Sequence, residues 1–255
     1  MVAGNFPRSV KVVRVKRVKS PAGFVPPSRK LVLFCLGLLV ALPGHAQTAD
    51  LQKVISQLNT AAAKFVSAQA NFSWDEFTAV VQQDEVQTGT IYFERKKGTT
   101  RMAAYLKQQN GKDAAKTITY DGGEVQYYVP GIKQLTILRA GANRSQWESF
   151  LTLGFGGSGA DLEKNWKVTV QGSDTMGGVS VVKLDLVPLD AKVMDLFTHA
   201  TIWVDPTRGV SYKQVFYQPS GDTRTALYQD IQYNTPVAGD VFQIKTAPGT
   251  TRQVK

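Results

Sequence analysis

The chain has 255 residues, with 30 lysines and arginines, 20 aspartates and glutamates, two histidines and one cysteine. So few histidines and cysteines leave little material for thiol, zinc or histidine-base chemistry. The formal net charge is +10, but residues 1–46 hold eight of the basic residues and no acidic one, so residues 47–255 carry only +2. The charge therefore does not indicate nucleic-acid binding, which requires a basic face on the folded domain.

The N-terminal region has the parts of a secretory signal. Residues 31–42, LVLFCLGLLVAL, form an apolar run that the basic dipeptide RK precedes, and the small residues Gly44 and Ala46 follow it. The run is too short to cross a bilayer as a helix, which needs about 20 residues. We predict that residues 1–46, a basic leader and signal peptide, are removed after Ala46 and that the protein is exported. A short membrane anchor that stays attached is the alternative.

The predicted cleavage also removes most of the reactive side chains. Cys35 lies inside the apolar run and His45 lies just after it, so residues 47–255 contain no thiol and only one histidine, His199. Phe34 precedes the cysteine, whereas a lipid-modified cysteine would need a small residue there. We expect His199 to be structural or exposed.

Residues 47–255 match the size of one ordinary domain. The segment 50–66 is expected to be a helix, because its apolar residues recur at steps of three and four. Asp50 is the expected N-cap. The residues that form the apolar face are Leu51, Val54, Ile55, Leu58, Ala62 and Phe65.

Strands dominate the rest of the chain. Alternating apolar and polar residues, separated by short turns rich in glycine, proline and aspartate, predict many antiparallel strands at regular spacing. Such a chain forms one large curled sheet, or a barrel. The predicted strands are 71–81, 86–95, 100–107, 116–121, 124–129, 132–139, 167–171, 179–187, 199–205, 210–218 and 224–233.

Two segments interrupt the strands. Residues 145–166 look helical at both ends with a glycine-rich stretch between them, and residues 190–197 form a short amphipathic helix. These apolar-faced helices must pack on the sheet. In a tight barrel, side chains would fill the interior, whereas in an open sheet the helices would act as a lid over a cavity. The predicted fold class is therefore mainly β with some α.

The strands carry many large apolar side chains. Each of them could simply belong to the core, but together with movable helices they could also hold an apolar ligand. The candidate cavity residues are Phe72, Trp74, Ile91, Phe93, Met102, Leu106, Tyr127, Trp203 and Phe216.

A glycine-rich motif invites a nucleotide-binding interpretation that its context excludes. Residues 154–159, GFGGSG, match the dinucleotide-binding pattern, and Asp174 lies 20 residues after Gly154. That pattern requires a preceding strand and a following helix within a β-α-β unit, but here the surroundings are antiparallel. A nucleophile elbow is also excluded, because Ala160 stands where a glycine is needed. We expect a hinge or a mobile loop.

The charged residues of the strands offer one candidate of interest. The adjacent acidic pairs 75–76 and 84–85 point to opposite faces of their strands, so neither pair makes a two-carboxylate site, and we expect solvated charges. Arg95 shares a strand face with Ile91 and Phe93. If that face lines the cavity, its guanidinium needs oxygen acceptors, since an unpaired buried charge is costly; the alternative is that Arg95 reaches water at the strand end.

Over nearly all of residues 47–255 the sequence resembles the periplasmic outer-membrane lipoprotein carrier family, the LolA type. The resemblance lies in the order and spacing of several motifs that follow an N-terminal amphipathic helix, the most telling being YDGGEVQYYVPGIKQL at 120–135. The other motifs are GTIYFERKKGTTRM, FLTLGFGGSGADLEKNW, VVKLDLVP, ATIWVDPTRGVSYKQVFYQPSGD and VFQIKTAPGT.

The resemblance implies an open antiparallel half-barrel covered by short lid helices. It implies a carrier that shields the acyl chains of lipoproteins and delivers them toward the outer membrane, with no enzymatic activity and no cofactor. The implied partners are acylated lipoproteins, an inner-membrane ABC-type release complex and an outer-membrane receptor; nucleic acid is not among them, and the protein is expected to be a monomer. A sensing or binding module for lipid or lipoprotein on the same fold, or a carrier of another lipid, remains the alternative.

The family arginine that holds the lid shut corresponds to Arg95. The sequence departs from the family pattern beside it, with Lys96 in place of the usual proline and Thr99 in place of an apolar residue. The residues expected to form the lid or its latch are Arg95, Trp147, Phe150, Leu151 and Phe155.

Overall fold

The structure is a computed structural model that describes residues 44–96, 99–139, 141 and 153–255, with side chains described from Asp50 onward. All of these residues lie in one compact unit, Leu42–Lys255. Helix α1 spans Gly44–Lys64, in agreement with the predicted helix but with an earlier start. The assignment of Asp50 as its N-cap is wrong, because no proline or glycine interrupts residues 45–49 and the helix continues back to Gly44.

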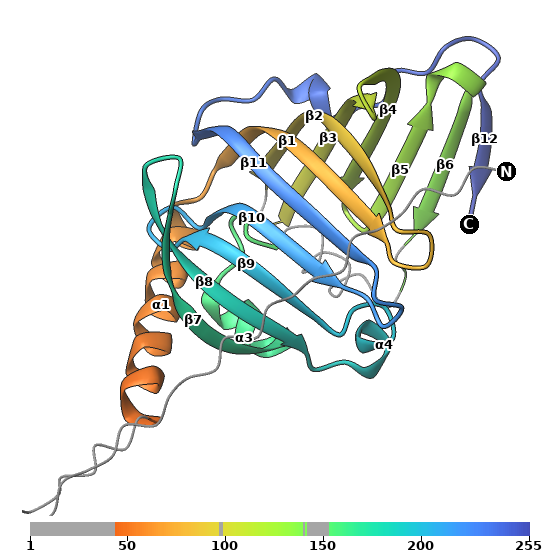
Figure 1. The fold of residues 1–255 in the computed structure, drawn as a ribbon. Coiled ribbons are helices and arrows are strands. Elements are labelled where there is room, and N and C mark those ends of the chain that lie inside the picture. The colour runs from red at the N-terminus through yellow and green to blue at the C-terminus, as the bar shows by residue number, and fades with distance from the viewer. Residues whose placement is uncertain (1–43, 97–98, 140, 142–152) are drawn as a thin grey trace, which may run out of the picture. The chain divides into compact units, whose positions relative to one another are not determined.

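Among the described residues, twelve strands form a single sheet (Figure 1), and their bounds confirm the predicted strand pattern. The first six are β1 (Ser67–Thr78), β2 (Gln83–Lys96), β3 (Thr99–Gln109), β4 (Lys112–Asp121), β5 (Glu124–Val129) and β6 (Gln134–Arg139). The others are β7 (Trp166–Met176), β8 (Val179–Pro188), β9 (His199–Asp205), β10 (Val210–Tyr217), β11 (Thr223–Tyr233) and β12 (Thr251–Val254). The last strand, β12, was not predicted.

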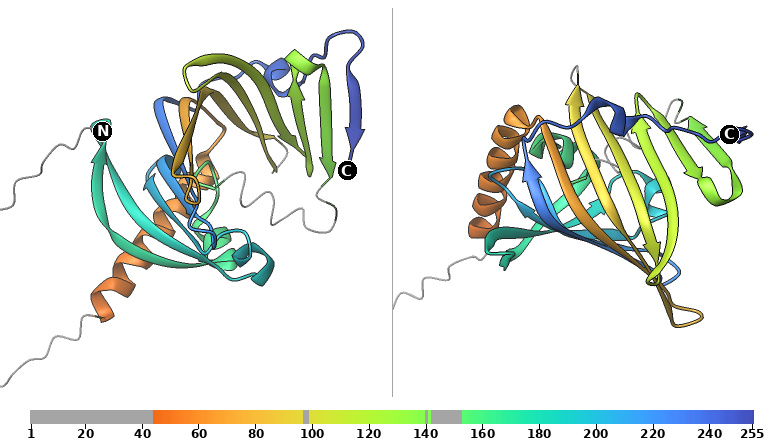
Figure 2. Two further views of the ribbon diagram at one scale, coloured as in Figure 1. Left: turned by 45° about the vertical axis from the view of Figure 1, so that its right-hand side comes forward. Right: turned by 90° about the horizontal axis from the view of Figure 1, so that it is seen from above.

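The sheet is open. Its strand order is β12-β6-β5-β4-β3-β2-β1-β11-β10-β9-β8-β7, so the first and second halves of the chain meet where β1 pairs with β11, and the end strands do not pair with each other. Figure 2 shows how strongly this sheet curls. The alternative of a closed barrel is therefore wrong, and the predicted mainly-β class with an open half-barrel is confirmed.

Short helical segments connect or cover the strands. They are η1 (Pro130–Ile132), α3 (Gly159–Asn165), α4 (Ala191–Met194) and η3 (Gly239–Phe242). Helix α1 packs against α3 and β7, and α3 also packs against β7, so both helices cover one half of the sheet (Figure 1). Ser158 caps α3, accepting a hydrogen bond from the Asp161 amide. In the part of the chain that the structure describes, no helix is both long and apolar enough to cross a membrane.

The core lies on one face of the sheet, which we call the inner face. A first cluster gathers buried side chains of β1–β4, β10 and β11 around Phe93, together with Phe65 just after α1 and Phe155 from the loop before α3. A second cluster joins Val54 and Leu58 of α1 to Leu162 of α3 and to the inner residues of β8 and β9. Alternation along the strands produces both clusters, because every second side chain points to the same face.

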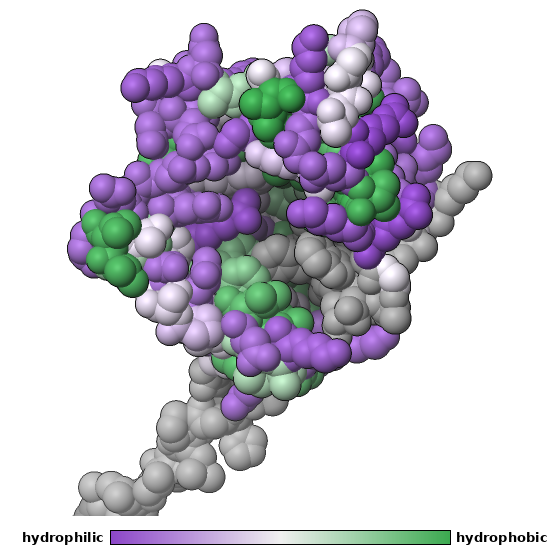
Figure 3. Space-filling view, turned by 90° about the vertical axis from the view of Figure 1, so that its right-hand side faces the viewer, coloured by the Kyte–Doolittle hydropathy of each residue, from purple (hydrophilic) through white to green (hydrophobic). Residues whose placement is uncertain are grey.

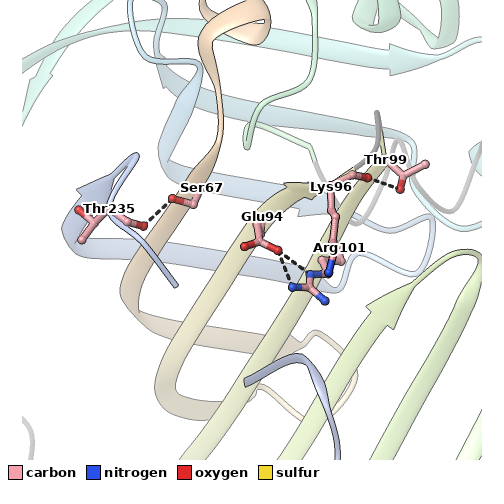
Figure 4. Close-up of polar contacts among 6 residues, drawn as sticks. All are labelled: Ser67, Glu94, Lys96, Thr99, Arg101 and Thr235. Carbon is pink, nitrogen blue, oxygen red and sulfur yellow. Dashed lines mark hydrogen bonds and ion pairs between the residues drawn. The ribbon is translucent and has the colours of Figure 1, made fainter. Parts of the chain in front are cut away.

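The opposite face of the sheet, the outer face, is covered in part by the last 22 residues. We call residues 234–255 the C-terminal strap. Its Phe242 is buried beneath the guanidinium of Arg101, which lies 4.0 Å from the ring centroid. The Ser67 hydroxyl donates to the carbonyl of Thr235 at 2.6 Å, and Arg101 is also paired with Glu94 (Figure 4). The strap therefore binds the outer face of β1–β3.

Candidate functional site

The inner face of the half-barrel is apolar and deeply buried. Six of the nine candidate cavity residues lie in its first cluster, each with at most 7% of its surface exposed: Phe72, Trp74, Ile91, Phe93, Met102 and Leu106. The strand register brings them together, since Phe93 lies opposite Met102 across the β2–β3 pair. Phe72 and Trp74 stack on each other at a centroid distance of 4.2 Å.

The other three candidates lie elsewhere. Tyr127 is half-buried at the margin of the inner face, opposite Ile118, and burial raises the pKa of its hydroxyl. Phe216 belongs to the second cluster. The assignment of Trp203 to the cavity is wrong: because its neighbours Ile202 and Val204 point inward, its indole points outward. The ammonium nitrogens of two lysines on the flanking strands, Lys183 and Lys213, lie 5.2 and 4.8 Å from the indole.

A loop closes over the first cluster. Phe155 precedes α3 and is 1% exposed although it lies outside the named strands, and it makes an isolated β-bridge with Val210 of β10. The ring stacks on Phe93 at 4.0 Å with an interplanar angle of 8°, and it meets the ring of Tyr228 edge-on at 4.8 Å. Phe155 therefore occupies the surface that an apolar ligand would contact.

Main-chain hydrogen bonds join this loop to strand β10 and the residue before it. The amide of Ser211 donates to the carbonyl of Gly154 at 2.7 Å, and the amide of Gly156 donates to the carbonyl of Gly209 at 3.0 Å. The buried side chain of Gln214 adds a bond from its Nε2 to the carbonyl of Leu153 at 2.5 Å. In this structure the glycine-rich motif, residues 154–159, is a closely packed loop that leads into α3; that it acts as a hinge or mobile loop stays a prediction.

Close packing explains the glycines better than a nucleotide site does. A Cβ atom at Gly154 would collide with the hydroxyl of Ser211, and one at Gly156 would collide with the ring of Phe65. Both glycines also have positive φ angles, +73° and +75°. The motif thus brings the loop close enough to β10 and Phe65 to insert Phe155.

We expect Gly156→Ala to lower the free energy of unfolding by about 1–3 kcal/mol more than Gly178→Ala does. Gly178 has nearly the same φ angle, +76°, but nothing lies within 4 Å of its missing Cβ. Both changes carry the same backbone strain, so the difference isolates the cost of overpacking against Phe65. Chemical denaturation of the two variants measures it, and equal losses would mean that the loop does not pack this tightly.

Arg95 lies on the inner face and joins the helix to the loop. One guanidinium nitrogen, Nη1, donates to the carbonyl oxygen of Ala62 near the end of α1, and the other, Nη2, donates to that of Gly156. The ring of Phe65 lies beneath the guanidinium, with 5.8 Å between Cζ and the ring centroid. The predicted hydrogen bonds to oxygens of the covering segments are present; a role in opening and closing the lid remains a prediction.

The departures from the family pattern lie at the end of the β2–β3 hairpin, next to Arg95. The hydroxyl of Thr99 donates to the carbonyl of Lys96 at 3.0 Å (Figure 4), so the two polar residues are bonded to each other. Three of the predicted lid residues, Trp147, Phe150 and Leu151, lie outside the described residues.

Sequence reasoning missed three residues that build the site. Phe65 packs under Arg95 and against Gly156, Gln214 holds the loop carbonyl, and Tyr228 supports Phe155 and donates from its hydroxyl to Gln214 at 3.4 Å. Phe65 and Tyr228 could be found from the apolar pattern of the segments to which they belong. A buried glutamine such as Gln214 gives no such signal, because its partner is a main-chain carbonyl 61 residues away.

Burial of Tyr228 raises the pKa of its hydroxyl to about 12 from the usual 10.0. Between pH 10 and 12 the unfolded chain loses this proton while the folded chain keeps it, so stability is fully present below pH 10 and falls as the pH rises toward 12. A shift of this size corresponds to roughly 3 kcal/mol. We expect Tyr228→Phe to lose less stability over this range than the native protein, as measured by denaturation at pH 9 and pH 11.5; parallel pH curves would contradict this.

Of the acidic residues expected to be solvated, Glu76 pairs with Arg224 at 3.5 Å. Asp75 departs from that expectation, because one of its carboxylate oxygens is buried and its pKa is raised by burial and by the nearby carboxylate of Asp84. The imidazole of His199 stacks on Tyr217 at 4.1 Å. Among the residues that the structure describes, no group of three histidines, cysteines or acids could hold a metal ion.

One view of the surface shows a hollow with hydrophobic residues in its walls (Figure 3). Beneath the covering helices, a cavity of about 30 Å³ lies between Leu58, Leu153, Leu162 and Ile202. That space suits about one water molecule. A larger apolar ligand would fit at this place only if the loop or α1 moved away.

Comparisons with known proteins establish the fold. No protein-family model matches the chain, and no curated protein matches it by sequence. Among solved structures, an uncharacterized conserved protein from Thermus thermophilus aligns with a TM-score of 0.52 and 10% identity over 82% of this chain and 100% of that one. MucB aligns with a TM-score of 0.50 and 15% identity over 77% of this chain; the match spans 63% of the MucB chain, less than two thirds of its length.

A LolA superfamily protein from Nitrosomonas europaea aligns less well, with a TM-score of 0.38 and 13% identity over 76% of this chain and 97% of that one. At these identities the likeness concerns the fold alone. The chain is thus an open half-barrel with an apolar inner face and a covering loop, and the fold implied by the resemblance to the lipoprotein carrier family is confirmed.

Proposed function

We propose that the protein carries the acyl chains of lipoproteins on its inner face and delivers them toward the outer membrane. One observation carries the proposal. The apolar inner face is covered by a side chain, Phe155, that comes from a separate loop and is joined to the rest of the molecule by hydrogen bonds. A side chain on a separate loop can leave the inner face while the sheet stays intact, whereas side chains that belong to the strands cannot.

The energetics favour exchange of the cover for an acyl chain. Exposing a buried phenylalanine costs roughly 2–3 kcal/mol. Each methylene group of an acyl chain that leaves water contributes about 0.8 kcal/mol. Three or four buried methylene groups would therefore offset the displacement of Phe155, and a long chain would leave a surplus that retains it. Release requires an acceptor that offers the chain an equally apolar environment.

Arg95 gives the cover a second, polar restraint. Its bonds to Ala62 and Gly156 exist only while α1 and the loop lie over the inner face. They therefore stabilise the closed form and oppose the bound form. A restraint of this kind favours handing the cargo on. The proposed cargo is an acylated lipoprotein, and the proposed donor and acceptor are an inner-membrane ABC-type complex and an outer-membrane receptor.

The proposal is tested with a fluorescent fatty-acyl probe and with mass spectrometry. The protein isolated from a periplasmic fraction should bind the probe without added metal or nucleotide and should carry acylated lipid or lipoprotein detectable by mass spectrometry. Absence of probe binding at micromolar concentrations would contradict the proposal.

A binding or sensing module on the same fold is the second candidate. Three hydrogen bonds join the loop to β10 and to the residue before it, and Arg95 adds another. So many bonds favour a loop that seldom leaves the inner face. A sensor would bind the acyl probe but retain it in the presence of acceptor membranes, whereas a carrier would release it. The same probe, followed in a transfer assay, separates the two.

Export is part of the proposal, and N-terminal sequencing checks it. We expect protein isolated from the periplasm to begin at Gln47, three residues after the first residue of α1. The apolar run 31–42 and the small residues that follow it support cleavage there. Recovery of residues 31–42 in a membrane-bound form would show instead that the segment stays attached.

A further inference from the structure

The edge of the sheet at β6 is occupied by the end of the chain itself. Strand β12 runs parallel to β6 over four residue pairs, from Thr251 beside Gln134 to Val254 beside Ile137. The amide of Thr251 donates to the carbonyl of Lys133 at 2.9 Å, and the amide of Lys255 donates to the carbonyl of Ile137 at 2.9 Å. The last residues of the C-terminal strap therefore act as an added strand.

This added strand is recognised almost entirely through its main chain. All four side chains of β12 are exposed, including that of Val254 at 60%. Every other strand pair in the described part of the sheet is antiparallel, and parallel pairing is slightly less stable per residue. The buried anchor of the strap, Phe242, lies nine residues before β12. The end of the strap can therefore leave β6 while its anchor stays in place.

The charges at this edge do not suit β12. Lys133 and Arg139 stand at the two ends of β6, and the strand that pairs with it contributes Arg252 and is followed by Lys255. Arg252 is paired with Leu135, so no two of these basic residues stand directly opposite each other. Like charges on neighbouring strands still repel at low ionic strength, and a carboxylate in their place would be attracted. The nearby acid, Glu124, is already paired with Arg139 at 3.3 Å. An extended segment that carries carboxylates would complement this edge better than β12 does.

A recess lies on the outer face of the sheet, over β3–β5, where the strap crosses it. It has a volume of about 350 Å³ and is lined by Tyr105, Tyr128 and Pro130 of the sheet side and by Val241 and Ile244 of the strap, among others. The hydroxyl of Tyr128 accepts a hydrogen bond from the amide of Ala247 at 3.0 Å, so the strap enters β12 directly past this recess.

We propose that this edge is a docking site for an extended, acidic segment of a partner protein, which pairs with β6 in place of β12. Addition of a strand to a sheet edge is a general mode of peptide recognition, in which main-chain bonds supply affinity and side chains supply specificity. The edge is separate from the inner face, so the proposal does not depend on acyl binding.

The test uses the protein with the single change Thr251→Pro, which removes the amide that donates to Lys133 and so weakens the native β12. Two dye-labelled peptides are compared. One has the sequence of residues 246–255, and the other has the same sequence with Arg252→Glu and Lys255→Glu. We expect the acidic peptide to bind at least threefold more tightly at low ionic strength, with the difference shrinking as salt is added.

A third peptide, acidic but N-methylated at the amide that corresponds to Thr251, is the control and should bind at least threefold more weakly than its unmethylated form. Equal binding of the methylated peptide, or no preference for the acidic one, would overturn the proposal. Self-association of Thr251→Pro would also overturn it, since the edge would then pair with a second copy.

A second measurement keeps the proposal testable if Thr251→Pro does not fold. In the otherwise unchanged protein, the double change Arg252→Glu and Lys255→Glu should slow hydrogen exchange at the amide of Arg139, which donates to the carbonyl of Lys255 at 3.4 Å. At least threefold slower exchange is expected at low ionic strength, and unchanged or faster exchange would show that charge does not govern this edge.

Discussion

A protein in which Phe155 is replaced by alanine is expected to bind a fluorescent acyl probe roughly ten- to hundredfold more tightly than the native protein. In the native protein the ring must leave Phe93 and Tyr228 before an acyl chain can take its place. The alanine variant no longer exposes a buried aromatic side chain on binding, which saves about 2–3 kcal/mol. Each 1.4 kcal/mol corresponds to a tenfold change in affinity. Equilibrium titration with the probe measures the effect.

Phe242→Ala is the matched control. It also removes a buried phenylalanine, but on the outer face beneath Arg101, so the affinity for the probe should not change. Both variants are expected to lose stability, by up to about 3–5 kcal/mol, so denaturation curves must show that each is folded under the titration conditions. Weaker binding by Phe155→Ala would mean that the ring is a wall of the acyl site and not its cover.

Arg95→Leu is expected to retain acyl cargo and to transfer it slowly. The native guanidinium makes two hydrogen bonds to segments that cover the inner face, and in the proposed cycle these bonds break when the cover opens. Bonds to a charged group contribute about 1.5–3 kcal/mol. Their loss shifts the balance toward the open, loaded form by roughly one or two orders of magnitude. Leucine fills part of the same space without leaving an unpaired charge on the apolar face. We therefore expect unchanged or tighter probe binding and at least tenfold slower transfer to acceptor membranes.

Arg101→Leu is the control for this prediction. Arg101 lies on the neighbouring strand β3 but faces outward, where it pairs with Glu94 (Figure 4). Its loss should reduce stability without changing the transfer rate. Transfer at the native rate by Arg95→Leu would mean that the bonds to Ala62 and Gly156 do not govern release. The hydrogen bonds between the loop, β10 and the residue before β10 would then hold the loop without the guanidinium.

Much of the fold follows from local patterns in the sequence. Alternating apolar residues and turn signals predict eleven of the strands, because each of those strands buries one face and exposes the other. Strand β12 could not be predicted in this way. Its residues, TRQV, are all exposed, so no alternation marks them. Their extended conformation is imposed by pairing with β6, and the strap brings them there through its anchor at Phe242.

The site was predictable only where one strand or motif carried the signal. Strand phase placed Arg95 beside Phe93, and the hydrogen bonds of its guanidinium agree with that placement. Trp203 fails as a cavity residue because size and hydrophobicity do not say which face of a strand a side chain occupies. Gln214 could not be found, since its role depends on the position of a distant loop.

Among the described residues, the hydrogen bonds of the Arg95 guanidinium go to main-chain carbonyls, and this has a consequence for how such proteins can diverge. Every residue type supplies a carbonyl oxygen, so Ala62 can be exchanged for another helix-forming residue without loss of the contact. Comparison of many sequences should then show no hydrogen-bond partner whose residue type changes together with this arginine. The position that must keep its identity is Gly156, where any side chain would meet Phe65 and push the acceptor out of reach.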